Sequence, residues 1–495
     1  MTVLATETRA LFMLFGATGD LAKRKLYPSI FNLYKKNYID QKHFALIGTG
    51  RRKWSDQDLR DVILESVKDS AESEDQANEF ASHFYYMSHD VTNPEHYRAL
   101  SDYADKLEAK YETEGNRIFY ISMAPNFFGT VAENLKSQNV LSDNGGFNRL
   151  IIEKPFGRDY KTAEELNNSL GKSFNEDQVY RIDHYLGKEM VQNIQALRFG
   201  NPIMESVWNN KYIKNIQVTL SEKLGVEERA GYYDNSGALR DMVQNHIMQI
   251  VTILAMEEPV AFKDTDIRNE KIRALRSLRI YDKDEARENF VRGQYGAKGE
   301  QRDYRHEDDV PTDSNTETYV AGKLMFDNQR WAGTPFYVRT GKMLADKFTR
   351  IDVVFKKPLI DVFDAGDKDK SGLDSDVLTL FVDPVQKVIL HLNGKVPGQG
   401  FTTKGIDLTH VQSDEDRKNT PEPYERLIHD AIKGDATSFA SWQEVGRAWK
   451  LADVVRNLWD TEKPDFPNYT PGSMGPKDAD DLLARDGNKW VFTLD

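Results

Sequence analysis

Short apolar runs alternate with amphipathic stretches along the first third of the chain. The runs that read as buried strands span residues 11–15, 44–47, 84–87, 117–121 and 149–152. Between the first two runs, apolar side chains recur at helical spacing from Leu26 to Tyr34. Strands that alternate with helices are typical of βαβ units and a parallel sheet. The pattern therefore predicts an α/β domain in residues 1–180, with a doubly wound, Rossmann-like parallel sheet.

The pattern changes after residue 180. Ile216, Val218 and Leu220 alternate with polar residues, which is the signature of a strand with one buried face. Similar strands are expected at residues 319–326, 336–340, 351–355, 378–382 and 388–392, and helices at 238–254, 424–433 and 442–458. We therefore expect a larger second domain, residues 181–495, of the α+β class with a mostly antiparallel β-sheet. The charged segments 282–313 and 361–376 are expected to be solvated excursions.

The composition excludes several classes of protein. Hydrophobic residues make up 39% of the 495 residues, which is enough apolar surface for large folded cores. The chain has no cysteine, so it contains no disulfides, thiolate metal sites or cysteine nucleophiles. Its 66 basic and 79 acidic residues leave a net charge of −13, which disfavours binding to nucleic acid. No run of 18 apolar residues and no signal-peptide pattern occurs, so we expect an untargeted, cytoplasmic protein that does not enter membranes.

A glycine-rich turn follows the first predicted strand and opens the first predicted helix. It reads Gly16-Ala-Thr18-Gly19-Asp20-Leu21. Glycines in such a turn let backbone amides approach a diphosphate at the N-terminus of the helix. The turn is shorter than the complete dinucleotide fingerprint and lacks the lysine of a P-loop. A tight structural turn without a ligand is therefore the alternative.

The second predicted strand ends in basic residues. Where NAD-binding folds carry an acidic residue for the ribose 2′-hydroxyl, this chain has Arg51, Arg52 and Lys53. Guanidinium groups bind a 2′-phosphate, whereas a carboxylate repels it. The pattern therefore predicts NADP as the cofactor. Arginine does not prevent binding of NAD, so use of both cofactors stays open, and the alternative is that these arginines only begin a solvated loop.

The segment 181–189 groups polar residues near the change of pattern. If the segment is helical, His184 and Lys188 share a face and offer two donors to a small dianion such as a phosphate monoester. A salt-bridged surface helix is the alternative. No His and carboxylate spacing typical of a metal site occurs, so no metal is expected. Three other histidines, His83, His89 and His96, are expected to be scattered over the surface.

Four further candidates lie within a predicted helix or at the ends of predicted strands. His246 lies where the predicted helix changes from polar to apolar, and a histidine with a carboxylate partner suits general-base catalysis near neutral pH. Glu222 and Lys342 follow their strands at positions whose side chains point to the buried face of the sheet. A charged group there needs hydrogen-bond partners, which sugar hydroxyls would provide. Lys154 follows a parallel strand at its carboxyl end, where ligands bind in open α/β sheets. An ordinary half-buried histidine and exposed strand ends are the alternatives.

Six motifs together resemble the glucose-6-phosphate dehydrogenase family. They are residues 16–21, 118–125, 153–157, 181–189, 225–231 with the later Gln244-Asn-His246, and 337–342. The run from Arg181 to Glu189 is the longest and most specific of them. The similarity covers nearly the whole chain and is greatest to bacterial members of the lactic-acid type.

This resemblance implies oxidation of D-glucose 6-phosphate at C1 to 6-phospho-D-glucono-1,5-lactone with hydride transfer to NADP, the first step of the oxidative pentose phosphate pathway. By the resemblance, His246 takes the proton of the C1 hydroxyl and Asp183 pairs with His246. The implied ligands of the 6-phosphate are His184, Tyr185, Lys188 and Lys347. The implied ligands of the sugar hydroxyls are Lys154, Glu222, Asp241 and Lys342.

The resemblance also bears on the cofactor and on assembly. The implied cofactor contacts are Gly16, Thr18, Gly19, Asp20, Leu21, Arg51, Arg52 and Lys154. Pro155 corresponds to a proline that the family keeps cis. The family forms dimers or tetramers through its large sheet, so we expect a homodimer. No metal and no additional structural NADP site are implied.

Two other functions stay open at this point. A sugar oxidoreductase of the inositol-dehydrogenase type shares the Glu-Lys-Pro turn and the two kinds of sheet, but needs no phosphate-binding cluster. A non-catalytic sugar-phosphate sensor needs no base, so the presence of Asp183 and His246 argues against it. Binding two anionic ligands to a chain of net charge −13 requires local positive fields, for which the candidates are Arg51, Arg52, His184, Lys188, Lys342 and Lys347.

Overall fold

The computed structural model describes residues 8–363, 373–399 and 402–494, which form two compact units. The first unit comprises the described residues up to Gly187 together with Pro259–Asn269 and Pro421–Gly446. The second unit comprises Lys188–Glu258, Glu270–Thr420 and the described residues from Arg447 onward. The chain therefore leaves the first unit and returns to it twice.

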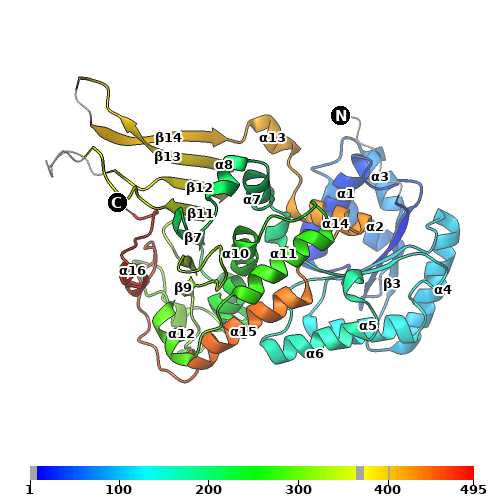
Figure 1. Cartoon of the computed structure of the whole chain (residues 1–495). Helices are drawn as coiled ribbons and strands as arrows, with labels where there is room; N and C mark the ends of the chain where they lie inside the picture. The colour runs from blue at the N-terminus through cyan, green and yellow to red at the C-terminus, as the bar shows by residue number, and fades with distance from the viewer. Residues whose placement is uncertain (1–7, 364–372, 400–401, 495) are drawn as a thin grey trace. The chain divides into compact units, whose positions relative to one another are not determined.

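The first unit contains a six-stranded parallel sheet in the order β3-β2-β1-β4-β5-β6 (Figure 1). The strands are β1 (Ala10–Phe15), β2 (Phe44–Gly50), β3 (Phe84–Ser88), β4 (Arg117–Ile121), β5 (Asn148–Ile152) and β6 (Val179–Arg181). The first five confirm the predicted strands, and the doubly wound, Rossmann-like topology is confirmed with them. The sixth strand lies beyond the predicted set.

The helices of the first unit alternate with these strands, where η marks 3-10 and π helices. They are η1 (Ala22–Leu26), α1 (Tyr27–Lys35), α2 (Asp56–Val67), α3 (Glu74–Ser82), α4 (Pro94–Tyr111), η2 (Pro125–Phe127), α5 (Phe128–Ser137), α6 (Tyr160–Gly171), η3 (Glu176–Gln178), η4 (His184–Gly187) and α14 (Pro423–Lys433). A local signal marks the start of α2. The Ser55 hydroxyl accepts a hydrogen bond from the Asp58 amide while the Asp58 carboxylate accepts one from the Ser55 amide, which is a capping box for α2.

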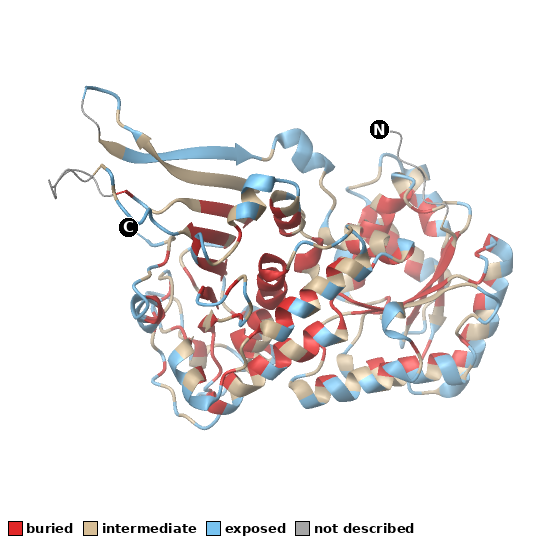
Figure 2. Ribbon diagram, in the orientation of Figure 1, coloured by how far each residue is buried: buried red, intermediate tan, exposed pale blue. Residues whose placement is uncertain are grey.

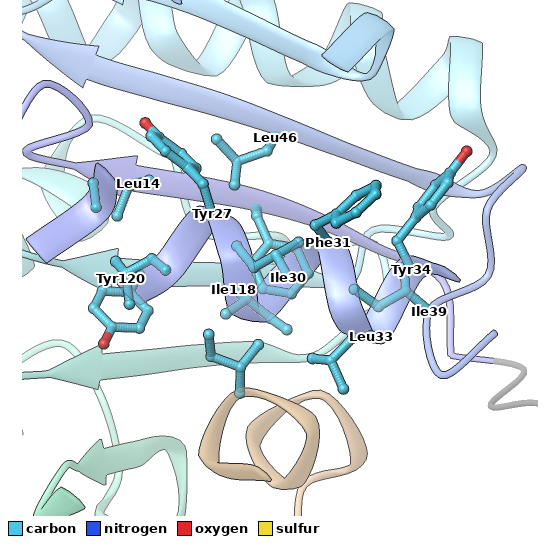
Figure 3. Close-up of a cluster of buried hydrophobic side chains, with 14 of the residues drawn as sticks. Leu14, Tyr27, Ile30, Phe31, Leu33, Tyr34, Ile39, Leu46, Ile118 and Tyr120 are labelled. Carbon is cyan, nitrogen blue, oxygen red and sulfur yellow. The ribbon is translucent and has the colours of Figure 1, made fainter. Parts of the chain in front are cut away.

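The core of the first unit lies between α1 and the sheet. Tyr27, Ile30 and Phe31 of α1 lie against Leu46 and Ile118 of the strands (Figure 3). The same buried cluster includes residues of α14, which is far away in sequence, namely Leu427, Ile428, Ala431 and Ile432. The late helix α14 is thus part of the core of the N-terminal fold.

The second unit contains an eight-stranded mixed sheet in the order β14-β13-β12-β11-β7-β10-β9-β8. The strands are β7 (Ile213–Ser221), β8 (Phe290–Gly293), β9 (Tyr319–Leu324), β10 (Phe336–Gly341), β11 (Phe348–Phe355), β12 (Val377–Asp383), β13 (Lys387–Lys395) and β14 (Thr403–Val411). All neighbours are antiparallel except β10 and β7, which are parallel. The mostly antiparallel sheet is confirmed, and β8 and β14 are strands that the pattern did not predict.

Helices lie around this second sheet. They are α7 (Glu189–Phe199), α8 (Pro202–Val207), η5 (Glu227–Arg229), α9 (Ala230–Asp234), η6 (Leu239–Ile247), α10 (Met248–Ala255), α12 (Lys283–Asn289), η7 (Tyr304–His306), α13 (Asp414–Asn419) and α16 (Asp478–Ala484). The remaining helices of the chain are α11 (Asp264–Ser277) and α15 (Trp442–Trp459). Among the described residues, no helix is long and apolar enough to cross a membrane.

Of the two expectations about charged segments, the structure contradicts one. The segment 282–313 is not a solvated excursion, because it contains α12, β8 and the fully buried Tyr295 and Tyr304. Its charged residues cover an aromatic core that a count of charges does not reveal. The second segment, 361–376, lies largely outside the described residues.

The expectation that His89 is a surface residue is wrong. Only 1% of its area is exposed, and its ring lies against Phe15 of β1 and Tyr97 of α4. Burial lowers the pKa of His89 to about 4, so the ring is neutral near pH 7. His83 is half-buried and its Nδ1 lies 2.8 Å from the Phe44 carbonyl oxygen, whereas His96 lies near the surface.

Strands β13 and β14 form the most exposed edge of the second sheet. In Figure 2 the inner strand β11 is buried whereas β14 is exposed along its length. Leu390 pairs with Leu408 and Leu392 with Ile406 on one face of these two strands. Ile406 and Leu408 are 39% and 57% exposed. The edge strand pair therefore presents an uncovered apolar face in this chain.

Candidate functional site

The glycine turn after β1 has the shape that a dinucleotide site needs. Gly16 has a φ of +94°, and a Cβ at this position would lie 2.1 Å from the Ser122 carbonyl oxygen. Only glycine fits so close an approach between the turn and the end of β4. The Gly16 and Ala17 amides donate to the Thr49 carbonyl of β2, which fixes the turn to the sheet. Helical backbone begins at Asp20, and Leu21 continues it into η1.

The basic end of β2 lies beside this turn. A Cβ on Gly50 would lie 3.3 Å from Cγ2 of Thr18, so the two segments are in contact. The Arg51 side chain is exposed, and no hydrogen bond or ion pair holds it within the described residues. The Arg52 guanidinium lies over the Trp54 ring at 5.3 Å. The turn and Arg51 thus fit a dinucleotide that carries a 2′-phosphate, with Arg52 stacked at its side.

A buried carboxyl stands next to Lys154 at the end of β5. The Tyr120 hydroxyl donates to Glu153 Oε1 at 2.6 Å, and the Tyr424 hydroxyl donates to Oε2 at 3.5 Å. Burial raises the pKa of Glu153 to about 7, and the two hydrogen bonds oppose that shift. The Lys154–Pro155 peptide bond is cis, as the resemblance implies.

Asp183 follows β6, the neighbour of β5. Its side chain is 3% exposed, and its Oδ1 accepts a hydrogen bond from the Tyr185 amide at 3.0 Å. The charge of Asp183 contributes to the raised pKa of Glu153, so the two carboxyl groups are close in space. The carboxyl ends of two adjacent parallel strands therefore carry Lys154 and Asp183, where open α/β sheets bind ligands.

The expectation of a shared helical face for His184 and Lys188 is wrong. His184 begins the 3-10 turn η4, which ends at Gly187, and Lys188 has the extended φ and ψ of −72° and 132° before α7 begins. The physical reason is a tertiary contact. Gly187 packs so closely that a Cβ there would lie 2.7 Å from the Pro423 carbonyl, and the chain turns at this point instead of continuing a helix.

Lys188 itself lies in the second unit beside a carboxylate. Its Nζ is 3.5 Å from Oδ2 of Asp383 at the end of β12, and 17% of its side chain is exposed. The ion pair places the ammonium at the end of β12. A phosphate would share this ammonium with Asp383.

The predicted hydroxyl ligands of the second unit gather around one tyrosine. Lys342 Nζ lies 2.7 Å from Glu222 Oε2 and 5.3 Å from the centre of the Tyr233 ring. Burial and the negative charges of Asp241 and Glu222 raise the pKa of Tyr233 far above its usual value. Glu222, Asp241 and Lys342 therefore surround Tyr233, a residue that the sequence pattern did not single out.

His246 lies in a π-helix and not in a regular α-helix. The predicted helix exists, but its first part, η6, has π geometry and only α10 is α-helical. Because a π-helix bonds residue i to residue i+5, Asp241 and His246 lie one turn apart on nearly the same side. His246 is 1% exposed, and its backbone amide donates a hydrogen bond to Oδ1 of the preceding residue, Asn245, at 2.6 Å. π-Turns inside helices are frequent at functional sites.

Lys347 lies on the turn that follows β10, which also carries Lys342. It is exposed, and its ammonium has no hydrogen bond or ion pair among the described residues. Its amide donates to Asp346 Oδ1 at 2.8 Å. The position suits an anion ligand that approaches from solvent.

Within each unit, the structure brings predicted site residues together. The first unit holds the glycine turn, Arg51 and Arg52 in one group and Lys154, Asp183, His184 and Tyr185 in another. The second unit holds Lys188, Glu222, Asp241, His246, Lys342 and Lys347. The pairing of Asp183 with His246 stays a prediction. The sequence pattern missed Tyr120, Tyr424, Tyr233 and Asp383, because nothing in the spacing of a lone tyrosine or strand-end aspartate indicates its neighbours.

Family models match both units of the chain. The model for the "Glucose-6-phosphate dehydrogenase, NAD binding domain" matches residues 13–193, and the model for the "Glucose-6-phosphate dehydrogenase, C-terminal domain" matches residues 195–491. These two matches cover most of the chain and include all of the predicted site residues.

Individual relatives agree with the models. The chain is 52% identical over 492 residues to glucose-6-phosphate 1-dehydrogenase of Leuconostoc mesenteroides, covering 99% of this chain and 100% of the relative. It is 50% identical over 489 residues to the enzyme of the same name from Bacillus subtilis (strain 168), covering 98% of each. A solved glucose-6-phosphate dehydrogenase in complex with its substrate glucose-6-phosphate is 33% identical with a TM-score of 0.89, covering 98% of this chain and 99% of that one. The chain therefore belongs to the glucose-6-phosphate dehydrogenase family.

Proposed function

We propose that this protein oxidises D-glucose 6-phosphate at C1 to 6-phospho-D-glucono-1,5-lactone, with NADP as the hydride acceptor. The observation that carries the proposal is the cluster of Glu222, Lys342 and Asp241 around Tyr233, in the same unit as His246. A carboxylate and an ammonium paired at 2.7 Å offer both an acceptor and a donor to neighbouring sugar hydroxyls. The models of a family of oxidoreductases of this kind match most of the chain.

The residues divide the work of the reaction between binding and proton removal. His246 takes the proton of the C1 hydroxyl on an imidazole nitrogen while the C1 hydrogen leaves as hydride, so the C1 carbon becomes the lactone carbonyl. Asp183 stabilises the imidazolium that forms. The 6-phosphate is held by His184, Tyr185, Lys188 and Lys347. The sugar hydroxyls are held by Lys154, Glu222, Asp241 and Lys342.

The first unit holds the cofactor. The glycine turn after β1 binds the diphosphate through Gly16, Thr18, Gly19, Asp20 and Leu21. Lys154 follows β5 at the carboxyl edge of the same sheet and also contacts the cofactor. Arg51 and Arg52 receive the 2′-phosphate, which favours NADP, and NAD is the second acceptor. Bound NADP supplies the hydride acceptor, and the protein supplies its position.

One assay tests the proposed reaction, substrate and cofactor together. With the purified full chain, absorbance at 340 nm should rise with glucose 6-phosphate and NADP, and more slowly with NAD. Unphosphorylated glucose and inositol should give much lower rates, because neither fills the phosphate ligands. Equal turnover of glucose would support a general sugar oxidoreductase, and binding of glucose 6-phosphate without turnover would support a sensor.

We also propose that two copies of this chain associate through the apolar face of β13 and β14. That face carries Val388, Leu390 and Leu392 of β13, which are half-buried, together with Ile406 and Leu408 of β14, which are exposed. A long apolar edge strand left open to water is an aggregation hazard, which association with a second copy would remove. The cytoplasmic location expected from the sequence stays a prediction.

Replacing Leu408 with Glu should convert the dimer into a monomer. Leu408 lies in the middle of the apolar face opposite Leu390, so a dimer would bury its new carboxylate without a partner. Sedimentation equilibrium or light scattering gives the mass directly. As a matched control, Thr409→Glu places the same charge on the opposite face of β14 and should leave the dimer intact. Monomeric wild-type protein would contradict the proposed assembly.

A further inference from the structure

The turn that carries Lys342 and Lys347 has an unfavourable backbone conformation. We call residues 341–347 the substrate turn. Met343, in its centre, has a φ of +52°, the left-handed region that residues with a Cβ rarely adopt. A methionine stays in this conformation only when surrounding bonds hold it there.

Bonds hold the substrate turn from two sides. On one side, the Met343 amide donates to the Leu224 carbonyl at 3.1 Å and the Leu344 amide to the Glu222 carbonyl at 3.0 Å. These bonds tie the turn to the end of β7, next to Glu222. This side is already part of the site described above.

The other side is formed by residues 469–473 near the C-terminus, which we call the C-terminal strap. The Tyr469 hydroxyl donates to the Lys342 carbonyl at 2.8 Å. The Gly472 amide donates to the Met343 carbonyl at 2.8 Å, and the Ala345 amide donates to the Ser473 carbonyl at 3.0 Å. Three positions of the substrate turn, Lys342, Met343 and Ala345, therefore bond to a segment that is more than a hundred residues later in the chain.

Tyr469 is itself firmly placed. It is 6% exposed, and its ring packs against Tyr319 with ring centres 5.6 Å apart. Its hydroxyl is 2.8 Å from Thr318 Oγ1, while the Lys342 amide donates to the Thr318 carbonyl at 2.9 Å. Tyr469 and Thr318 thus hold Lys342 by its carbonyl and by its amide.

We propose that Tyr469 is a positioning residue for Lys342, and that the C-terminal strap keeps the substrate turn in the conformation that binds the sugar phosphate. This inference rests on the proposed function, because it assumes that Lys342 and Lys347 bind the substrate. Tyr469 acts on the substrate only through Lys342, whose carbonyl it holds. Without its hydroxyl, the strained Met343 relaxes and the ammonium of Lys342 moves away from Glu222.

The test compares Tyr469→Phe with Tyr337→Phe in the full chain. Tyr337 is a matched control because it is also fully buried, and its hydroxyl donates to Asp486 at 2.6 Å, away from the substrate turn. We expect Tyr469→Phe to raise the KM for glucose 6-phosphate by about fivefold to tenfold, the effect of losing one hydrogen bond. The KM for NADP should stay unchanged, and Tyr337→Phe should change neither constant.

A second variant separates positioning from general loss of stability. Asparagine adopts positive φ more readily than methionine, so Met343→Asn favours the observed turn by itself. Added to Tyr469→Phe, it should restore most of the lost affinity for glucose 6-phosphate. The inference is overturned if Tyr469→Phe and Tyr337→Phe give the same KM, or if the KM for NADP rises equally. Loss of the proposed function would show instead as no turnover by the wild-type protein.

Discussion

Replacing His246 with Asn should lower kcat for glucose 6-phosphate by about a thousandfold or more, the usual contribution of a general base. Asparagine keeps a polar, hydrogen-bonding group at this position but cannot take the proton of the C1 hydroxyl. Because His246 is buried in η6 and is not assigned to phosphate binding, the dissociation constant of glucose 6-phosphate should change little. Stopped-flow measurement of turnover, with calorimetry for binding, separates the two quantities.

His184→Asn provides the matched control for this variant. It removes a histidine that we assign to the 6-phosphate, so it should raise the KM by about tenfold while kcat stays near the wild-type value. A loss of kcat in His246→Asn together with a rise in KM in His184→Asn would distinguish the general base from the phosphate ligand. A kcat for His246→Asn within tenfold of the wild type would remove His246 from the role of base.

Replacing Arg51 with Ala should raise the KM for NADP by about 10- to 100-fold, the value of a charge-assisted hydrogen bond to phosphate. The KM for NAD should remain near the wild-type value, because NAD has no 2′-phosphate. The structure supports a large effect, since the Arg51 guanidinium has no partner among the described residues and is available to a ligand. Initial rates with each cofactor at saturating glucose 6-phosphate give both constants.

Lys53→Ala is the matched control for Arg51→Ala, because it removes one exposed positive charge two residues further along the same loop. A similar rise in KM for NADP in both variants would mean that the loop attracts the cofactor only by its overall charge. An equal effect of Arg51→Ala on NAD and NADP would mean that Arg51 does not contact the 2′-phosphate.

The sequence predicted the first sheet well because buried parallel strands are continuous apolar runs. The run at 11–15 is an example, and the structure extends it by only one residue to Ala10–Phe15. The exception is β6, Val179–Arg181, which is too short to show any periodicity. Its pairing with β5, and not its own composition, makes it a strand.

The hydrophobic pattern did not predict strand β14 of the second sheet. Strand β14 has almost no buried residue, and it carries Gly405 and several charged or polar side chains. Its backbone pairs with β13 along nine positions, so main-chain hydrogen bonds hold it in place. A prediction based on apolar alternation with one buried face is weak for such a strand.

The candidate site was predicted best where a residue follows a strand and least well where tertiary contacts decide. Lys154 and Glu222 follow strands. Burial raises the pKa of Glu153, the charge of the adjacent Lys154 opposes that rise, and Glu222 forms an ion pair with Lys342. His184 and Lys188 were expected on one helical face, but the close packing of Gly187 against Pro423 ends the turn between them. Tyr424 approaches Glu153 from a segment far away in sequence, which no local pattern reveals.

The repeated return of the chain to the first unit limits how this protein can be divided. A fragment that stops at Gly187 would retain all six strands of the parallel sheet, yet it would lack Leu427, Ile428 and Ala431 of α14, which complete the same core. The cofactor-binding unit is therefore not a continuous segment of the chain, and truncation at one position would not produce it as a complete domain. Gene fusions or circular permutations of this enzyme would need to keep the late helix on the same polypeptide as the N-terminal sheet.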